Sequence, residues 1–358
     1  MSRFWSKVVE GLDPYVPGEQ PTIPDLIKLN TNESPYGPSP SVLEAVRAQA
    51  SDTLRLYPDP ESIALRDALA TYHGVRRANV FVGNGSDEVL GHIFAALLKH
   101  DAPLLLSDIT YGFYPVYCRL FGICYETVPV DERLCIRVSD YRRNAGGLVI
   151  ANPNAQTGIA LKQTDIVRLL DDHPDSPVVI DEAYVDFGGE TAAKLIGNYP
   201  NLVVVRTFSK SRALAGLRLG YALADAALIE ALIRVKNSFN SYPIGRVTQA
   251  AALACIADDG YFWETRDRIV DQREKLAKSL TQLGFDLIPS SANFVLARRP
   301  GYPGPQLATE LRKRAILVRT FPETRISDYV RITIGTDHEM NQLVATLSEL
   351  VSDAPRPG

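Results

Sequence analysis

Apolar runs of strand length alternate with segments of helical periodicity between residues 79 and 205 of this 358-residue chain. The predicted strands lie at 79–82, 104–106, 148–151, 178–180 and 202–205, and the predicted helices at 86–99, 112–121 and 163–172. Such alternation is typical of a mostly parallel sheet covered by helices on both faces. We therefore expect an α/β fold, with ligands gathered at the carboxyl ends of its strands.

The segments before and after this block have a different character. Prolines and glycines recur through residues 1–40 and predict an extended N-terminal arm. Ser41-Val42-Leu43-Glu44 has the pattern of a capping box, so we expect a helix that is capped at Ser41. The arm is thus followed by a large domain at 41–245, which contains the alternating block.

After residue 245 the alternation gives way to a smaller set of elements, for which we expect an α+β domain at 246–358. A long helical stretch opens this segment. The predicted elements are helices at 244–283, 306–314 and 337–351 and strands at 292–297 and 329–334.

Two polar motifs follow predicted strands of the large domain. One strand ends in Asp181, with Tyr184 three residues further on, and the next strand precedes Lys210, with Arg218 eight residues later. A buried lysine can act as a neutral amine and form a Schiff base. A buried aspartate needs a cation, such as a protonated pyridine nitrogen, and an arginine can bind a phosphate with two hydrogen bonds. Together these residues predict a site for pyridoxal 5′-phosphate.

A glycine-rich turn supports this interpretation. Gly83-Asn84-Gly85-Ser86-Asp87 follows a predicted strand and opens a predicted helix, whose free N–H groups suit a phosphate. Glu88 stands where a dinucleotide fingerprint has its third glycine, so a Rossmann site is not expected. By itself the segment is more consistent with an ordinary glycine turn. Next to Lys210 and Arg218, phosphate binding is favoured.

Composition excludes several other classes of protein. The net charge of −4 disfavours a nucleic-acid surface or an anionic membrane as partner, and no apolar stretch has the length of a signal peptide core or a membrane span. The four cysteines form no CxxC pair, which predicts free thiols in the cytoplasm. The five histidines are scattered, so we expect no metal site.

Motifs spread over nearly the whole chain resemble those of a known family. They lie at 14–20, 28–38, 57–59, 83–88, 181–184, 209–221 and 330–336. In these motifs the chain resembles the fold-type-I pyridoxal-phosphate aminotransferases, and within them the histidinol-phosphate aminotransferases. The resemblance implies a large domain with a mostly parallel central sheet, a smaller α+β domain, and an arm that packs on the small domain and on a partner subunit.

The resemblance also implies roles for individual residues. Lys210 would form the Schiff base and then act as general base, Asp181 would keep the pyridine nitrogen protonated, and Tyr184 would donate to the phenolic O3′. The other implied cofactor contacts are Tyr111 stacked on the ring, the backbone of Ser86 and Asp87 together with Ser209 and Arg218 at the phosphate, and Tyr57 reaching that phosphate from the neighbouring subunit of a homodimer.

On the substrate side, the resemblance implies that Arg319 and Arg331 bind the anionic end of the substrate and that Tyr15 helps from the arm. Two guanidinium groups suit a dianionic phosphate, whereas one would suffice for an α-carboxylate. The implied reaction converts L-histidinol phosphate and 2-oxoglutarate into imidazole acetol phosphate and L-glutamate, a step of histidine biosynthesis. An aromatic-amino-acid aminotransferase and an amino-acid-phosphate decarboxylase are the alternatives within the family. A transcription regulator is not expected, because no DNA-binding domain fits before Ser41.

One motif departs from the family pattern of Asn-Pro-Thr-Gly, in which the asparagine binds O3′. Here Ala155 and Gln156 replace the asparagine and the proline. Either Asn154 or Asn152 takes over the contact to O3′, or Tyr184 makes it alone. Without a proline, we expect a trans peptide bond between Ala155 and Gln156.

Overall fold

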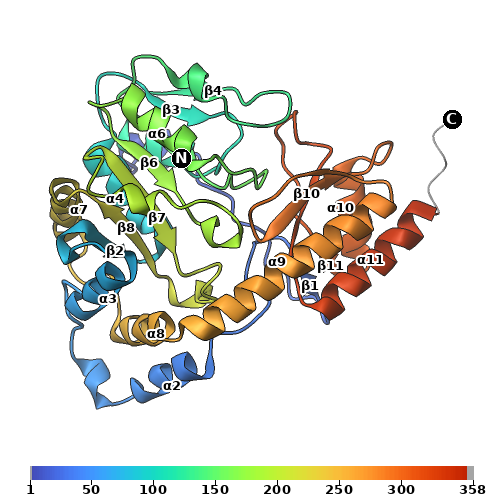
Figure 1. Cartoon of the computed structure of the whole chain (residues 1–358), viewed down its shortest axis with the longest axis horizontal. Coiled ribbons are helices and arrows are strands. Elements are labelled where there is room, and N and C mark those ends of the chain that lie inside the picture. Colours follow the sequence, from blue (N-terminus) through green and yellow to red (C-terminus); the bar gives the residue numbers. More distant parts are fainter. Residues whose placement is uncertain (1, 353–358) are drawn as a thin grey trace.

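The computed structural model describes residues 2–352. Its centre is a seven-stranded sheet with the strand order β2-β8-β7-β6-β5-β3-β4 (Figure 1). The strands are β2 (Val80–Gly83), β3 (Leu104–Ser107), β4 (Tyr125–Val128), β5 (Gly147–Ala151), β6 (Val178–Asp181), β7 (Leu202–Thr207) and β8 (Gly220–Ala224). The pairs β3–β4, β3–β5, β5–β6 and β6–β7 are parallel, and β8 runs antiparallel to both of its neighbours.

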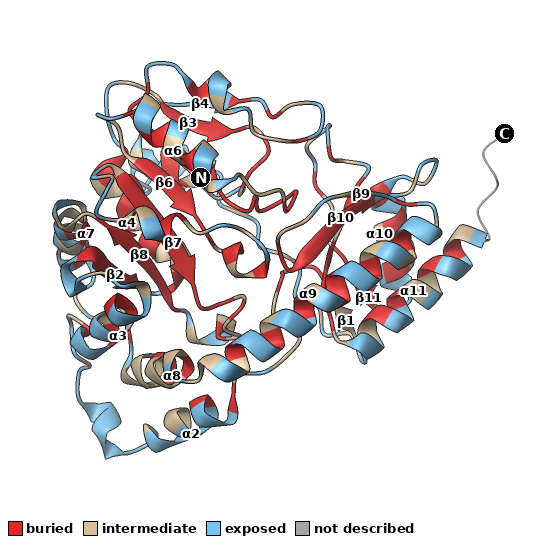
Figure 2. Ribbon diagram, in the orientation of Figure 1, coloured by how far each residue is buried: buried red, intermediate tan, exposed pale blue. Residues whose placement is uncertain are grey.

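Alternate residues of each central strand enter two separate hydrophobic cores, one on each face of the sheet. Val179, Val203 and Val205 belong to one core, and Val178 and Val204 to the other. The first core is covered by α4 (Gly85–Leu97), α5 (Tyr114–Phe121) and α7 (Ala226–Phe239), and the second by α3 (Ile63–His73), α6 (Gln163–Asp172) and α8 (Arg246–Ala257). Burial on both faces explains why these strands are continuous apolar runs (Figure 2).

The C-terminal residues form a smaller α+β unit beside the large sheet (Figure 1). Its elements are α9 (Asp259–Gln282), β9 (Asp286–Ile288), β10 (Phe294–Arg298), α10 (Gly304–Lys313), β11 (Ile316–Leu317), β12 (Val330–Thr333) and α11 (Asp337–Ser352). Strands β9, β10 and β12 form an antiparallel sheet. The N-terminal arm, which carries α1 (Lys7–Glu10), crosses to this unit, where β1 (Ile27–Lys28) pairs in parallel with β11.

The expected capping box at Ser41 is wrong. Helix α2 (Pro40–Ala48) is capped by Ser39, whose Oγ accepts a hydrogen bond from the Val42 N–H, and Pro40 occupies the first helical position. A proline is tolerated there because the first N–H groups of a helix have no partner within it. The Ser41 hydroxyl instead donates to Asp258, at the start of α9.

The predicted helical stretch at 244–283 is two helices rather than one. Asp258 separates α8 from α9, and its side chain accepts a hydrogen bond from the Tyr261 N–H. Helix α8 stays with the large sheet, whereas α9 extends to the small unit (Figure 1). No helix in residues 2–352 is long and apolar enough to cross a membrane.

Candidate active site

A cavity of about 410 Å³ lies between the carboxyl ends of the large sheet, the N-terminal arm and the small unit. Most of the site residues predicted from the sequence contribute to its wall. These are Tyr15, Asp87, Tyr111, Tyr184, Ser209, Lys210, Arg218, Arg319 and Arg331. Its size is that of a small-molecule site, and its position is the one at which open α/β sheets bind ligands.

Lys210 lies just beyond the end of β7 and reaches into this cavity. The turn that carries it is fixed by Thr207, whose Oγ1 accepts a hydrogen bond from the Ser209 N–H at 3.1 Å. The Lys210 Nζ donates to the carbonyl of Thr31 at 2.9 Å and lies 5.8 Å from the centre of the Tyr184 ring. Among residues 2–352, Lys210 is the only lysine on the cavity wall, and its amine is held by a neutral acceptor of the arm.

Asp181 ends β6 and lies behind the residues that line the cavity. Its carboxylate accepts hydrogen bonds from the Tyr114 hydroxyl at 2.8 Å and from the Ala183 N–H at 3.1 Å. Burial raises its pKa to about 6, and these two hydrogen bonds counteract the rise only in part. A buried carboxylate of this kind gains from a cation placed next to it.

A buried ionic network lies behind the loops that carry Tyr184 and Lys210. Arg206, on β7, pairs with Glu182 at 3.1 Å and also with Asp186. Asp186 in turn accepts a hydrogen bond from Ser211, the residue after Lys210. The network ties the segment after β6 to the segment after β7.

The amino end of α4 forms a second polar region of the cavity wall. The Asn84 side chain does not cap the free N–H groups of the first turn. Gly85 has φ +81°, and a Cβ there would lie 2.5 Å from the Arg218 guanidinium. A Cβ on Gly220 would lie 2.3 Å from the Ser86 nitrogen. The glycines therefore allow close approach of a guanidinium to a helix N-terminus, an arrangement that suits a phosphate.

Two tyrosines line the cavity beside this region. The Tyr111 hydroxyl donates to Asp87 at 2.9 Å, and burial raises the pKa of Tyr111 far above its ordinary value. Tyr15, from the arm, lies with its ring 5.9 Å from that of Tyr111. Burial also raises the pKa of Tyr15, although Arg319 and Arg331 oppose the effect. Both phenols are therefore neutral hydrogen-bonding groups at physiological pH.

Arg319 and Arg331 form a bridge between neighbouring backbone segments of the small unit and line the far side of the cavity. Arg331 donates to the carbonyls of Ala155 at 2.8 Å and Asn30 at 3.2 Å. Among residues 2–352, no carboxylate pairs with either guanidinium. Burial lowers the pKa of Arg331, because a guanidinium is costly to remove from water where no carboxylate pairs with it. The pair is thus equipped to bind an anion.

Asn154 does not line the cavity, and its contact with the cofactor remains the prediction made from the sequence. Its side-chain NH2 group donates to the Ile109 carbonyl at 2.7 Å, and its Oδ1 accepts from the N–H groups of Gln156 and Thr157. The Asn152 Oδ1 accepts from the Leu161 N–H, whereas its buried Nδ2 has no hydrogen-bond partner among residues 2–352. Of the three residues considered for the O3′ contact, Tyr184 is the one that lines the cavity. The bond between Ala155 and Gln156 is trans, as predicted, and the cis bond in this segment joins Asn152 to Pro153.

Tyr57 does not line this cavity. Its side chain is 79% exposed and stacks on Tyr242, with ring centres 4.6 Å apart. A contribution of Tyr57 to a neighbouring subunit remains the prediction made from the sequence.

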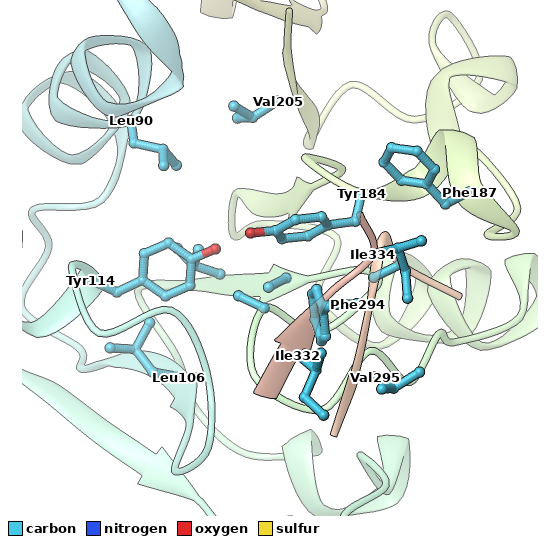
Figure 3. Close-up of a cluster of buried hydrophobic side chains, with 14 of the residues drawn as sticks. Leu90, Leu106, Tyr114, Tyr184, Phe187, Val205, Phe294, Val295, Ile332 and Ile334 are labelled. Atoms are coloured by element: carbon cyan, nitrogen blue, oxygen red, sulfur yellow. The ribbon is translucent and has the colours of Figure 1, made fainter. Parts of the chain in front are cut away.

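Two residues that were not predicted from the sequence form hydrogen bonds to predicted site residues. Tyr114 donates to Asp181, and Asn32 donates through Nδ2 to the Tyr184 hydroxyl at 3.0 Å. Figure 3 shows the hydroxyl groups of Tyr114 and Tyr184 pointing toward the same space. Tyr114 lies in a predicted helix, three residues after Tyr111, and Asn32 lies in the motif at 28–38. In the sequence, only this closeness to predicted site residues and motifs could have pointed to them.

Comparisons with known proteins agree with this geometry. Residues 24–347 match the family model described as aminotransferase class I and II. The chain is 58% identical to histidinol-phosphate aminotransferase 2 of Rhizobium meliloti (strain 1021), over 98% of this chain and 100% of that protein. It is also 58% identical to histidinol-phosphate aminotransferase of Gluconacetobacter diazotrophicus, over 98% and 99% of the two chains.

Solved structures include a similar protein with a bound cofactor. The crystal structure of histidinol-phosphate aminotransferase from Sinorhizobium meliloti in complex with pyridoxal-5′-phosphate superposes with a TM-score of 0.88. That protein is 27% identical to this chain, and the match covers 98% of each.

Proposed function

The chain belongs to the class I and II aminotransferases, in their histidinol-phosphate aminotransferase family, and we propose that it transfers the amino group of L-histidinol phosphate to 2-oxoglutarate. It is a pyridoxal-phosphate-dependent enzyme that acts on small molecules. The products would be imidazole acetol phosphate and L-glutamate, and the reaction would serve histidine biosynthesis.

The residues around the cavity fit pyridoxal 5′-phosphate. Gly85 and Gly220 leave room for Arg218 and the amino end of α4 to hold the phosphate. The carboxylate of Asp181, buried and without a cation, would hold the pyridine N–H. When bound, the cofactor supplies a carbonyl that reacts with amines and a ring that withdraws electrons.

Three side chains would then handle the protons. Lys210 is the amine on the cavity wall, so its Nζ would bind the cofactor and later carry a proton to and from the substrate carbon. Tyr184 would donate to O3′, and Asp181 would keep the pyridine nitrogen protonated. Tyr15 and Tyr111 would narrow the entrance and reduce the access of water.

The single observation that supports histidinol phosphate as the substrate is the pair of arginines, Arg319 and Arg331, on the cavity wall. Arg319 and Arg331 both line the cavity, and no carboxylate in the described part of the chain pairs with them. A dianionic phosphate can accept hydrogen bonds from both guanidinium groups, and the two carboxylates of 2-oxoglutarate can use the same cations in the second half of the reaction.

An amino-donor panel tests this assignment. Purified enzyme with pyridoxal 5′-phosphate is given histidinol phosphate, phenylalanine or tyrosine, with 2-oxoglutarate as acceptor, and glutamate is measured. We expect the highest kcat/KM for histidinol phosphate. A preference for phenylalanine would favour the aromatic aminotransferase instead, and CO2 release would favour the decarboxylase. Lys210→Ala is the control that should abolish turnover and the yellow colour that survives dialysis.

We further propose a cytoplasmic homodimer in which each subunit completes the other's site. Exposed apolar side chains cluster on the segment that carries Tyr57, and they include Leu54 and Leu56. Tyr57 is too exposed to serve its own subunit and would reach the phosphate of a partner. The cytoplasm is supported by the four free cysteines, which a reducing compartment would preserve.

A further inference from the structure

The direction in which Tyr184 donates its proton depends on a residue of the N-terminal arm. Tyr184 lines the cavity, whereas Asn152 and Asn154 do not, and Ala155 has no side-chain amide, so the contact to O3′ is assigned to Tyr184. A phenol can donate or accept. Tyr184 can therefore donate to O3′ only if its hydroxyl proton points into the cavity.

Asn32 is fully buried and touches the Tyr184 hydroxyl at 3.0 Å. The Asn32 backbone N–H donates to the Thr333 Oγ1 at 3.0 Å, and the Thr333 hydroxyl donates to the Asn32 Oδ1 at 3.0 Å. Because Oδ1 is thereby the acceptor of Thr333, the donor group Nδ2 must face Tyr184. The orientation of the amide follows from the network.

The backbone around Asn32 is held as firmly as its side chain. Asn293 donates from Nδ2 to the Asn32 carbonyl at 3.0 Å. Asn32 also adopts φ +57°, a left-handed conformation that asparagine and glycine tolerate better than other residues.

We propose that Asn32 is a positioning residue that makes Tyr184 an obligatory hydrogen-bond donor toward the cofactor. A phenolic oxygen that accepts from an NH2 group cannot donate back to it. The single Tyr184 proton is therefore directed away from Asn32 and into the cavity. In this chain Asn32, acting through Tyr184, offsets the loss of the family asparagine at Ala155.

The inference rests on the proposed pyridoxal-phosphate chemistry, and a spectroscopic titration tests it. Donation to O3′ favours the form of the bound cofactor that has lost its imine proton, so its loss raises the pH midpoint of the visible absorbance change. We expect Asn32→Gly, which keeps the left-handed backbone, to raise the midpoint by about 0.5 to 1 pH unit. The affinity for pyridoxal 5′-phosphate, measured by fluorescence quenching, should fall by about three- to tenfold.

Asn32→Asp is the sharper variant. A carboxylate at this position accepts the Tyr184 proton and turns it away from the cavity, so the midpoint should rise at least as far as in Asn32→Gly. The charged groups that face Tyr184 are Lys210 and Arg331, and every variant retains them.

A double-mutant cycle separates this role from a structural one. In a Tyr184→Phe background, Asn32→Gly should cause no further shift of the midpoint. Asn293→Ala disturbs the same backbone without touching Tyr184 and should leave the midpoint unchanged. If the Asn32 variants do not fold, Thr333→Val, which frees the Asn32 amide to rotate and also removes the acceptor of the Asn32 backbone N–H, should give a smaller shift of the same sign.

An unchanged midpoint in Asn32→Gly with cofactor bound would overturn the inference. So would an equal shift with and without the Tyr184 hydroxyl. In either case the wild type would still bind the cofactor and transaminate, so the proposed function would survive. A wild type that takes up no pyridoxal 5′-phosphate would instead remove the proposed function and the inference together.

Discussion

At the scale of single residues, the site contains charged side chains that have no partner of opposite charge. The cofactor or the substrate would supply that partner. Among residues 2–352, Asp181 is a buried carboxylate with two neutral donors and no paired cation. Within the same residues, no carboxylate pairs with Arg319 or Arg331. A buried charge without a partner lowers the stability of the ligand-free protein, and a charge of the opposite sign on a bound molecule would compensate for it.

Replacing Asp181 by asparagine should stabilise the cofactor-free protein above neutral pH. The pKa of Asp181 is raised from 3.8 to about 6 in the fold, so its ionisation destabilises the folded protein. This destabilisation is absent below about pH 4 and fully present above about pH 6. We expect Asp181→Asn to be more stable at pH 8 by about 1–3 kcal/mol in urea unfolding, with a smaller difference at pH 5.

Addition of pyridoxal 5′-phosphate should reverse this order at pH 8, because the carboxylate pairs with the pyridinium and the amide does not. Asp181→Asn should also lose most of its turnover while it still binds the cofactor. A stability difference that does not change with pH would contradict the assigned ionisation.

Replacing Arg319 by alanine should weaken the reaction of the phosphate donor more than that of an aromatic amino acid. Each charge-assisted hydrogen bond contributes about 1.5–3 kcal/mol, which corresponds to a loss of about ten- to a hundredfold or more in kcat/KM for histidinol phosphate. Arg314→Ala, on the surface beside Glu310, is the matched control and should leave both donors unaffected. Equal losses for both donors would argue against phosphate binding by Arg319.

At the scale of elements, the site depends on the close approach of β8 and α4. Gly220 begins β8 and pairs with Gly83 of β2, and Ser86 lies directly beside it in the first turn of α4. The three atoms nearest to a Cβ at Gly220 are all backbone atoms of Gly85 and Ser86, so they cannot rotate away. The loop that carries Lys210 is tied to the loop after β6 through Asp186 and Arg206. The cavity wall is thus made of segments whose relative positions are fixed by backbone packing and buried ion pairs.

Gly220→Ala should therefore damage the phosphate end of the site. The new Cβ would lie 2.3 Å from the Ser86 nitrogen and 2.5 Å from the Gly85 carbonyl carbon. We expect a loss of about 1–3 kcal/mol in the free energy of unfolding and at least a tenfold weaker affinity for pyridoxal 5′-phosphate. Gly216→Ala, where a Cβ meets no atom within 4 Å, is the control and should change neither quantity. An unaltered affinity in Gly220→Ala would show that the amino end of α4 does not hold the phosphate.

At the scale of the whole molecule, the cavity joins three parts of the chain that are far apart in the sequence. The arm contributes Tyr15 and Asn32, the large domain Lys210, and the small unit Arg319 and Arg331. Strand β1 fixes the arm on the small unit by pairing with β11. The substrate would therefore be held between the two domains, with a fourth contribution from a partner subunit if Tyr57 acts in trans.

Hybrid dimers test this contribution. Tyr57→Ala and Lys210→Ala subunits should each be inactive or nearly so, and mixing them should restore activity, because a hybrid dimer retains one site with both residues intact. Subunit exchange is verified by mass tags, and the activity of each variant mixed with itself is the baseline. No recovery after complete exchange would mean that Tyr57 and Lys210 do not belong to a shared site.

Much of the fold could be predicted because its information is local. The five predicted strands of the large sheet are present within two residues of their expected bounds, since strands buried on both faces must be continuous apolar runs. The edge strand β4 has an exposed Tyr125-Glu126-Thr127 run and carries no such signal. The predicted cap of α2 is two residues from the observed one. Ser39 and Ser41 are both suitable N-cap residues, and only the position of Pro40 in the first turn shows that Ser39 is the cap.

The sequence by itself determined the positions of Asp181 and Lys210, because residues that end parallel strands must meet at one edge of the sheet. Only the tertiary structure decided which amide contacts Tyr184. Asn154 satisfies its own loop, whereas Asn32 is oriented by Thr333, which lies 301 positions later in the chain. The direction of a hydrogen bond depends on every partner of both groups, and those partners are brought together only by the fold.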